Sequence, residues 1–309
     1  MNERSIYTDL LREFSKHNHK IFVVTPVEKR KNEQTTLIEG ANTKVLKLKI
    51  GNIQKTSLIE KGISTLMLEA QYKKGIEKYF YDIKFDLILF STPPITLQKA
   101  VEFVKRRDGA RTYLLLKDIF PQNAVDIEIL KTTGLKALVY KFLRRKKKRL
   151  YDLSDYIGCM SKANVDYLLK HNPDINSGIV EVCPNSIDPV DINMTPYEKS
   201  HVREKYDIPF DKTVFIYGGN LGKPQGIDFL IDCIRENEIY EKSFFLIVGS
   251  GTEYGKLREY FDNEKPKNAK LMGHLPKSDY EMLVNSCDVG LIFLDRRFTI
   301  PNFPSRILP

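Results

Sequence analysis

The chain has 309 residues, with 49 Lys and Arg against 40 Asp and Glu, which gives a net charge of +9. Its 42% hydrophobic content excludes a disordered chain, and its length predicts about two domains. No run of about 18 uncharged apolar residues occurs, and Asn2-Glu3-Arg4 lacks the apolar core of a signal peptide, so we expect no membrane-spanning segment.

Cysteine and histidine spacing gives no sign of a metal site. Neither a CxxC nor an HExxH pattern occurs among the four cysteines and five histidines. We therefore expect reduced cysteines that serve packing, a cytosolic protein, and no metal.

Strand-like and helix-like segments alternate along the chain, which predicts an α/β protein with two parallel sheets and crossover helices. An amphipathic helix is expected at 6–17, followed by strands at Ile21–Thr25, Val45–Lys49, Leu87–Ser91, Thr112–Leu116, Tyr156–Met160 and Ile179–Val182. Residues 184–196 are rich in Pro, Asn and Asp, which indicates a linker. Further strands are expected at Thr213–Tyr217, Phe244–Val248, Ala269–Met272 and Val289–Phe293. We predict two domains, 1–188 and 189–309.

A basic helix is expected late in the first half. Between Glu128 and Asp152 there are nine Lys and Arg and no acidic residue, and apolar residues recur at helical spacing at Leu135, Leu138, Val139, Phe142 and Leu143. Such a helix suits an anionic membrane surface, contacted through residues 135–150. A solvated helix on an ordinary core stripe fits the pattern equally well. Nucleic acid is disfavoured, because no aromatic residues interleave the basic run.

The second half opens with the most informative pattern of the chain. The strand Thr213–Tyr217 runs into Gly218-Gly219-Asn220-Leu221-Gly222-Lys223, and a helical pattern begins at Ile227. Glycines let the backbone approach a ligand, and a helix start adds about half a positive charge, so this turn suits the diphosphate of a nucleotide sugar. An ordinary βα turn also fits. Gly249 and Gly251 end the next strand in a similar way.

Several stretches together resemble a known family by their order and spacing: LKDIFPQNAVD (Leu116–Asp126), VCPNSID (Val182–Asp188), YGGNLGKPQGID (Tyr217–Asp228), LIVGSGTEYGKL (Leu246–Leu257), NAKLMGHLP (Asn268–Pro276), CDVGLIFL (Cys287–Leu294) and NFPSRIL (Asn302–Leu308). They are similar to the family-4 retaining glycosyltransferases that assemble bacterial capsule, O-antigen or exopolysaccharide. The resemblance implies a GT-B fold, in which two Rossmann-like domains face each other across a cleft. The first would bind the acceptor and the second a UDP- or GDP-sugar.

Both ends of the chain differ from that plan. The first expected element is a helix where a Rossmann-like domain opens with a strand, and Pro309 falls within a motif of the family. We expect an incomplete chain with a truncated C-terminal domain.

The resemblance also assigns residues. Asp118 follows a strand, where the family presents an Asp or His, and it would orient or deprotonate the acceptor hydroxyl; a carboxylate that caps the next helix is the alternative. Ser91, Thr92, Ser161 and Asn185 end other strands on the same acceptor side. The donor would contact Gly218, Gly219, Asn220, Lys223, Gly249, Gly251, His274, Phe303, Pro304, Ser305 and Arg306.

The chain departs from the family pattern at two places. Pro301 and Pro309 occupy the positions of the usual pair of glutamates, and Asn220 and Gln225 occupy those of an Arg and a Lys. Lys223 is then the only cation left in the first glycine loop.

The expected reaction is a sugar transfer that retains the anomeric configuration, with backbone N–H groups, Lys223 and Arg306 stabilising the departing diphosphate. No DxD sequence occurs, so neither a metal nor another cofactor is expected. The expected acceptor is a lipid-diphosphate-linked glycan at the inner face of the plasma membrane, where the protein would be peripheral. A nucleotide-sugar epimerase or hydrolase of the same fold, or an inactive fragment that only binds nucleotide, remains open.

Overall fold

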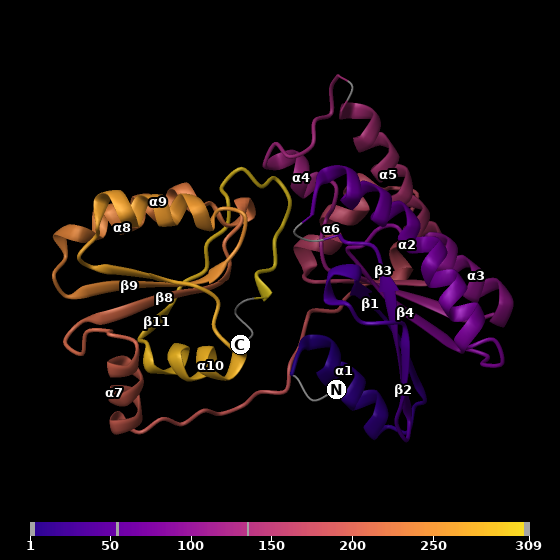
Figure 1. The fold of residues 1–309 in the computed structure, drawn as a ribbon. Coiled ribbons are helices and arrows are strands. Elements are labelled where there is room, and N and C mark those ends of the chain that lie inside the picture. The colour runs from indigo at the N-terminus through magenta and orange to yellow at the C-terminus, as the bar shows by residue number, and fades with distance from the viewer. Residues whose placement is uncertain (1–3, 54–55, 135, 306–309) are drawn as a thin grey trace. The chain divides into compact units, whose positions relative to one another are not determined.

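The computed structural model describes residues 4–53, 56–134 and 136–305, and these form two compact units (Figure 1). The first unit ends at Asp188 and also includes Thr299–Phe303, while the second begins at Pro189, runs to Phe298 and includes Pro304. Asp126 in the first unit accepts hydrogen bonds from Thr299 N at 2.7 Å and from its hydroxyl at 3.0 Å, which fixes the returning segment there. The sequence does not predict this return.

The first unit contains a four-stranded parallel sheet in the order β4-β5-β6-β7. Its strands are β4 (Leu87–Thr92), β5 (Arg111–Leu116), β6 (Tyr156–Cys159) and β7 (Val180–Val182). The connecting helices are α3 (Gln98–Asp108), α4 (Gln122–Asp126), α5 (Lys136–Leu153) and α6 (Lys162–His171). Because the strands are parallel and joined by crossovers, their carboxyl ends lie at one edge of the sheet.

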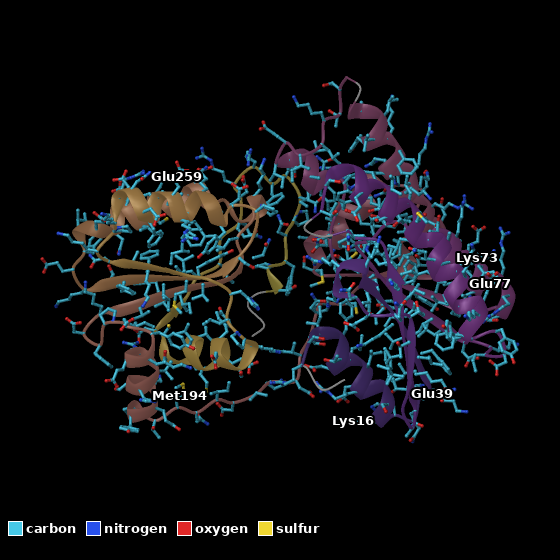
Figure 2. The ribbon with its side chains drawn as sticks, viewed as in Figure 1. Lys16, Glu39, Lys73, Glu77, Met194 and Glu259 are labelled. Atoms are coloured by element: carbon cyan, nitrogen blue, oxygen red, sulfur yellow. The ribbon has the colours of Figure 1, made fainter. Side chains whose placement is uncertain are left out.

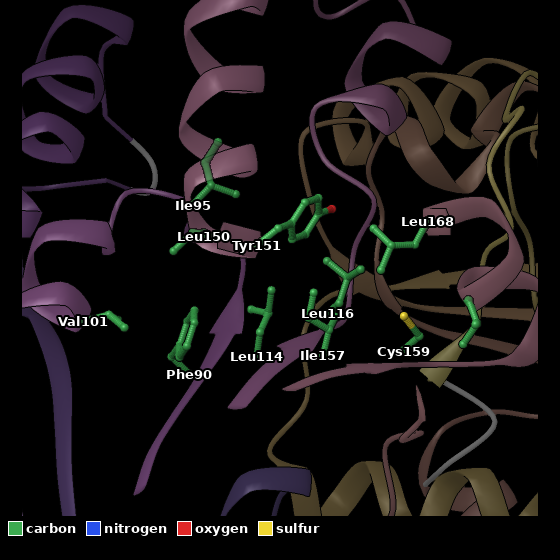
Figure 3. Packing of buried hydrophobic residues seen from close by; sticks show 11 residues of the cluster. Phe90, Ile95, Val101, Leu114, Leu116, Leu150, Tyr151, Ile157, Cys159 and Leu168 are labelled. Atoms are coloured by element: carbon green, nitrogen blue, oxygen red, sulfur yellow. The ribbon is translucent and has the colours of Figure 1, made fainter. Parts of the chain in front are cut away.

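The core of this unit forms between the sheet and its helices (Figure 3). Leu114 and Ile157 from neighbouring strands are fully buried, and so is Leu150 from α5. Figure 3 shows these side chains facing one another with Tyr151 beside them. Burial of each such side chain contributes about 1.5–3 kcal/mol to the stability of the fold. The core therefore holds in place the strands that carry candidate functional residues at their carboxyl ends.

A second, three-stranded sheet completes the first unit, in the order β1-β3-β2. It consists of β1 (Ile21–Glu28), β2 (Thr36–Glu39) and β3 (Thr43–Ile50), accompanied by α1 (Ile6–Lys16), the 3-10 turn η1 (Lys29–Lys31) and α2 (Leu58–Tyr79). β1 and β3 are parallel, whereas β2 is antiparallel to β3. The prediction of one parallel sheet in this half is therefore wrong. β2 escaped prediction because it is largely exposed and shows no buried face; Ile38, for example, is 47% exposed.

The second unit has one parallel sheet in the order β10-β9-β8-β11. Its strands are β8 (Thr213–Asn220), β9 (Ser243–Ser250), β10 (Ala269–Met272) and β11 (Val289–Gly290), and its helices are α7 (Pro196–Lys205), α8 (Ile227–Glu236), α9 (Tyr254–Glu264) and α10 (Lys277–Ser286). In Figure 1, α8 and α9 cover one face of the sheet, while α7 and α10 cover the other. The predicted α/β class, with parallel sheets and crossover helices, is confirmed.

Side chains fill the space between helices and sheets in both units, and charged pairs lie on the outer helix surfaces (Figure 2). On α2, for example, Lys73 and Glu77 form an i,i+4 pair with 3.6 Å between Nζ and Oε1. Met194, just before α7, packs against one of the two cores of the second unit.

Candidate functional site

The strand order of the second unit reverses beside β8. β9 and β10 follow on one side of β8, and β11 lies on the other. In open α/β sheets, ligands bind at the carboxyl ends of the strands where the order reverses. This topological switch point is therefore the place in the second unit where a ligand is expected, and the residues that end β8 and follow β11 surround it.

The first glycine pair continues β8 instead of opening a turn. The sequence predicts that the strand ends at Tyr217, but Gly218, Gly219 and Asn220 pair with Val248, Gly249 and Ser250 of β9. The predicted turn between this strand and the helix at Ile227 therefore begins only after Asn220. Glycine tolerates the left-handed φ of +118° at Gly219 and the close approach of β9, which allows the ladder to extend by three residues.

Successive peptide groups of β8 point alternately toward β9 and toward β11, and this shows which of them lie beyond the pairing with β11 at the switch point. The carbonyls of Val214 and Ile216 accept hydrogen bonds from Asp288 N at 3.0 Å and Leu291 N at 2.8 Å, so even-numbered residues face β11. Pairing with β11 ends at Ile216. The N–H groups of Gly218 and Asn220 face the same side, beyond the last paired residue. They form a short row of donors at the switch point.

Three glycines are required by close packing around these donors. A Cβ on Gly218 would lie 1.8 Å from Tyr280 Oη, and one on Gly249 would lie 1.9 Å from Gly219 O. A Cβ on Gly251 would lie 2.2 Å from Leu221 O. Such distances are far below van der Waals contact. A side chain at Gly249 or Gly251 would displace the backbone of β8 or its loop, whereas one at Gly218 would require the Tyr280 side chain to move. A part in donor binding stays a prediction for all three.

The loop after β8 is held by neutral side chains. Asn220 Nδ2 donates to Gln225 Oε1 at 3.1 Å, and Gly222 N donates to the same oxygen at 3.2 Å. Asp295 N, in the segment after β11, donates to Pro224 O at 2.9 Å. The loop and the segment after β11 therefore lie against each other beside the switch point.

Lys223 is the cation of this loop. It begins the 3-10 turn η3 (Lys223–Gln225) and is exposed, and no described residue pairs with its ammonium group. Helix α8 then begins at Ile227, after Gly226 in the left-handed conformation. A helix N-terminus carries about half a positive charge, so Lys223 and α8 add positive potential near the donors of β8.

The remaining predicted donor residues are His274 and residues 303–306. His274 is exposed and follows β10, which is two strands away from β8. Phe303 belongs to the first unit, whereas Pro304 and Ser305 belong to the second. Arg306 and Pro309 lie outside the described residues.

The first unit brings several predicted acceptor residues to the carboxyl edge of its four-stranded sheet. Ser91 and Thr92 end β4, and Asn185 follows β7. Tyr7 of α1 donates to Ser91 Oγ at 2.9 Å, and Lys117, directly after β5, donates to Asn185 Oδ1. The ammonium of Lys117 also lies 4.4 Å from the centre of the Tyr7 ring.

Tyr7 and Lys117 therefore link Ser91 to Asn185. The sequence reasoning did not select either of them. The position of Lys117 directly after a buried strand was the available signal for that residue. For Tyr7 there was none, because its contacts depend on how α1 packs.

Asp118 also lies at this edge. Asp118 as a whole residue is exposed. The protein around its carboxyl group nevertheless excludes water from it, and this desolvation raises the pKa of the carboxyl group to about 6. The alternative reading of Asp118 as a helix cap is wrong, because α4 begins after Pro121 without a side-chain cap. A carboxyl group with such a pKa accepts a proton near neutral pH, as a general base must.

Two other predicted residues at the same edge are a helix cap, Ser161, and a buried residue, Thr92, whose hydroxyl has no hydrogen-bond partner among the described residues. Ser161 caps α6: its Oγ accepts from Asn164 N at 3.3 Å and donates to Asn164 Oδ1 at 2.7 Å. Thr92 is only 2% exposed. Their contact with an acceptor stays a prediction.

The basic helix α5 differs from its sequence description. Lys147 is buried, and Lys146, Lys148 and Arg149 pair with Glu69, Asp174 and Glu102. Leu150 and Tyr151 form the core stripe, whereas Leu138, Val139 and Phe142 are 66%, 50% and 42% exposed. Part of the positive charge of this helix is therefore buried or paired, and contact of residues 135–150 with an anionic membrane stays a prediction. Lys141 and Arg145 are exposed beside the outward apolar residues, and Leu135 is outside the described residues.

Within the described part of the chain, no group of three or more His, Cys, Asp or Glu is placed to hold a metal ion. None of its helices combines the length and the apolar character needed to cross a bilayer.

Comparisons with known proteins place this fold. No family model matches the chain. The probable glycosyltransferase WbjE of Pseudomonas aeruginosa is 24% identical over 227 residues, which cover 72% of this chain and 54% of the relative. The chain thus spans about half the length of that curated relative.

Solved structures are similar over almost the whole chain. An E. coli trehalose-6-phosphate structure with bound UDP-2-fluoro glucose matches with a TM-score of 0.65 at 12% identity, over 95% of this chain and 76% of the other. The structure of WaaG, a glycosyltransferase involved in lipopolysaccharide biosynthesis, matches with a TM-score of 0.58 at 11% identity, over 94% and 72%. At these identities the similarity concerns the fold.

Proposed function

We propose that this chain, which has the GT-B glycosyltransferase fold, transfers a sugar from a UDP- or GDP-sugar to an acceptor of bacterial surface polysaccharide synthesis. The observation that carries the proposal is the row of N–H donors of Gly218 and Asn220 at the switch point of the second unit. Prearranged donors of this kind stabilise the negative charge that develops on a leaving diphosphate.

Positive charge near these donors supports the same assignment. Lys223 is exposed in the adjoining loop, and the N-terminus of α8 follows three residues later. Both would attract a diphosphate without a metal ion. UDP-2-fluoro glucose in the E. coli structure of the same fold is consistent with a nucleotide-sugar donor here.

Asp118 in the first unit is the proposed acceptor-side group. Ionised, it would orient or deprotonate the attacking hydroxyl, and its raised pKa makes it a stronger base than an ordinary aspartate. We infer retention of configuration and an oxocarbenium-like state from the family resemblance. The polysaccharide assignment rests on that resemblance and on the description of WaaG.

Membrane contact belongs to the same proposal. On α5, exposed Leu138, Phe142 and Arg145 follow one another at i, i+4 and i+7, with Lys141 beside them. Apolar and basic side chains on one exposed face suit the interface of an anionic membrane. A lipid-diphosphate-linked glycan at the inner face of the membrane is the acceptor that this arrangement favours.

Incubation of the chain with UDP- and GDP-sugars, with and without a bacterial membrane lipid extract, tests the function. We expect nucleotide release that depends on the extract. Conversion of the sugar without an acceptor would instead indicate an epimerase or hydrolase. Nucleotide binding by calorimetry without any turnover would indicate a fragment that only binds nucleotide, and an absence of binding would contradict the donor site itself.

A further inference from the structure

Lys117 is a half-buried cation at the carboxyl edge of the β4–β7 sheet, and it forms no ion pair with any described residue. It contacts the amide oxygen of Asn185 and the ring of Tyr7, both uncharged, and the thiol of Cys183 is close enough to interact with it electrostatically. Three other half-buried cations of the same unit pair with carboxylates: Lys105 with Asp155 at 2.9 Å, Arg107 with Asp108 at 2.7 Å and Lys146 with Glu69 at 3.5 Å. Lys49, which is also half-buried, bonds to the amide oxygen of Gln34 at 3.2 Å.

The surroundings of Lys117 leave its charge uncompensated. Burial lowers the pKa of its amine, because removing an ammonium group from water disfavours the charged form. An ammonium group has three N–H donors, and Asn185 Oδ1 takes one of them. At least one donor remains for a ligand, and an anionic oxygen would both accept its hydrogen bond and balance the charge.

The location indicates which molecule supplies that oxygen. Ser91 is the last residue but one of β4, and Asp118 and Asn185 follow β5 and β7 at the same edge, which is the side where α/β sheets bind ligands. Lysine binds phosphate as a compact point charge, and α5 in the same unit has an exposed basic and apolar face that suits anionic lipid.

We propose that Lys117, positioned by Asn185 and Tyr7, binds a phosphoryl group of the acceptor, as in a lipid-linked diphosphate. This inference rests on the proposed transferase function, and it adds the group through which the first unit recognises its acceptor. The Tyr7 ring would hold the cation through its face, while its hydroxyl is engaged by Ser91.

Calorimetric titration of the full chain with farnesyl diphosphate and with inorganic pyrophosphate tests the assignment, in the presence of saturating UDP so that the donor site is occupied. We expect Lys117→Met to weaken binding about tenfold or more, as for loss of a charge-assisted contact. Lys162→Met is the matched control, because Lys162 lies near the same sheet edge but is exposed and pairs with Asp166. It should leave binding unchanged.

Two further variants show whether weaker binding comes from lost recognition of the phosphoryl group or from a protein that does not fold. Asn185→Asp places a carboxylate beside the ammonium, which should compete with the phosphoryl group and weaken binding while Lys117 is retained. Tyr7→Phe keeps the ring and should preserve binding. Melting temperatures measured in parallel identify any variant that fails to fold.

The outcomes show whether the phosphoryl group comes from a lipid-linked or a free diphosphate. They also separate a failure of the Lys117 assignment from a failure of the proposed transferase function. If Lys117→Met weakens the binding of farnesyl diphosphate and of pyrophosphate equally, the phosphoryl group alone determines recognition. If wild type binds only farnesyl diphosphate, the ligand is lipid-linked. If Lys117→Met and Asn185→Asp bind both probes like wild type, or if wild type binds neither, the Lys117 assignment is wrong. UDP or GDP binding measured separately then decides whether the donor site still stands.

Discussion

Asn220 donates a side-chain hydrogen bond to Gln225 Oε1 at 3.1 Å, and this pair closes the loop beside the donors of β8. The resemblance places an Arg and a Lys at these two positions in the family. In this chain, two neutral amides satisfy each other there, so the loop contributes less positive charge to a diphosphate. Lys223 alone supplies the charge of this loop.

We therefore expect Lys223→Ala to weaken UDP or GDP binding by about fivefold, which is the effect of removing one exposed cation near a diphosphate. Calorimetry measures the change. Lys277→Ala, in the same unit at the start of α10, serves as a control for net charge and should bind like wild type. Unchanged binding by the Lys223 variant would contradict its assignment.

The reverse change should strengthen the site. Gln225→Lys restores a cation at a family position and frees the Asn220 amide for a ligand, so we expect nucleotide diphosphate to bind about three- to tenfold more tightly. Gln225→Met removes the same hydrogen bonds without adding charge and should show no gain. Equal affinities of the two variants would show that charge at position 225 does not reach the ligand.

Asp118 predicts a pH dependence of turnover. Desolvation by the surrounding protein raises the pKa of its carboxyl group to about 6, so the basic form required to accept a proton is lost as pH falls through that value. We expect kcat/KM to rise with pH and to level off above about 6. Asp118→Asn should lower kcat by about 100-fold or more and abolish this limb of the profile.

The raised pKa of Asp118 also makes the stability of the folded protein depend on pH. The folded state holds the proton of Asp118 more tightly than the unfolded state, so its contribution to stability is lost as pH rises from about 4 to about 6. Asp118→Asn should raise the melting temperature more near neutral pH than at about pH 4. A difference independent of pH would contradict the raised pKa.

The exposed face of α5 predicts binding to anionic vesicles. Lys141→Gln with Arg145→Gln should weaken flotation with phosphatidylglycerol vesicles, because each cation near such a surface contributes about 1 kcal/mol. Lys148→Gln with Arg149→Gln removes equal charge from the same helix, but these residues already pair with Asp174 and Glu102. The control pair should therefore have a smaller effect. Equal losses would indicate attraction by net charge rather than by this face.

The sequence predicted those features whose signals are local. The glycines around β8 and β9 mark close backbone approach, and the alternation of strands and helices marks the parallel sheets. The extension of β8 to Asn220 was missed, because glycine in a sequence indicates a turn as readily as a tight strand pairing. The contact of Tyr7 with Lys117 joins residues far apart in the chain, and periodicity carries no information about it.

Lys147 belongs to the basic run of α5, and its burial leads to a prediction on stability. It is 4% exposed, its ammonium lies 5.4 Å from the centre of the Tyr151 ring, and burial lowers its pKa to about 8. The unfolded chain holds this proton more tightly than the folded one. Stability is therefore reduced below about pH 8 and recovers as pH rises toward 10.5.

Lys147→Met retains the packing of the aliphatic stem and removes the buried charge. We expect it to raise the free energy of unfolding near neutral pH by up to about 3 kcal/mol, with the gain shrinking as pH approaches 10.5. Urea unfolding across this pH range measures both effects. Lys148→Met, one residue further on the exposed side, should be close to neutral because a surface ion pair contributes only about 0–1 kcal/mol. A Lys147 variant that is less stable at every pH would show that contact with the Tyr151 ring outweighs the cost of burying the charge.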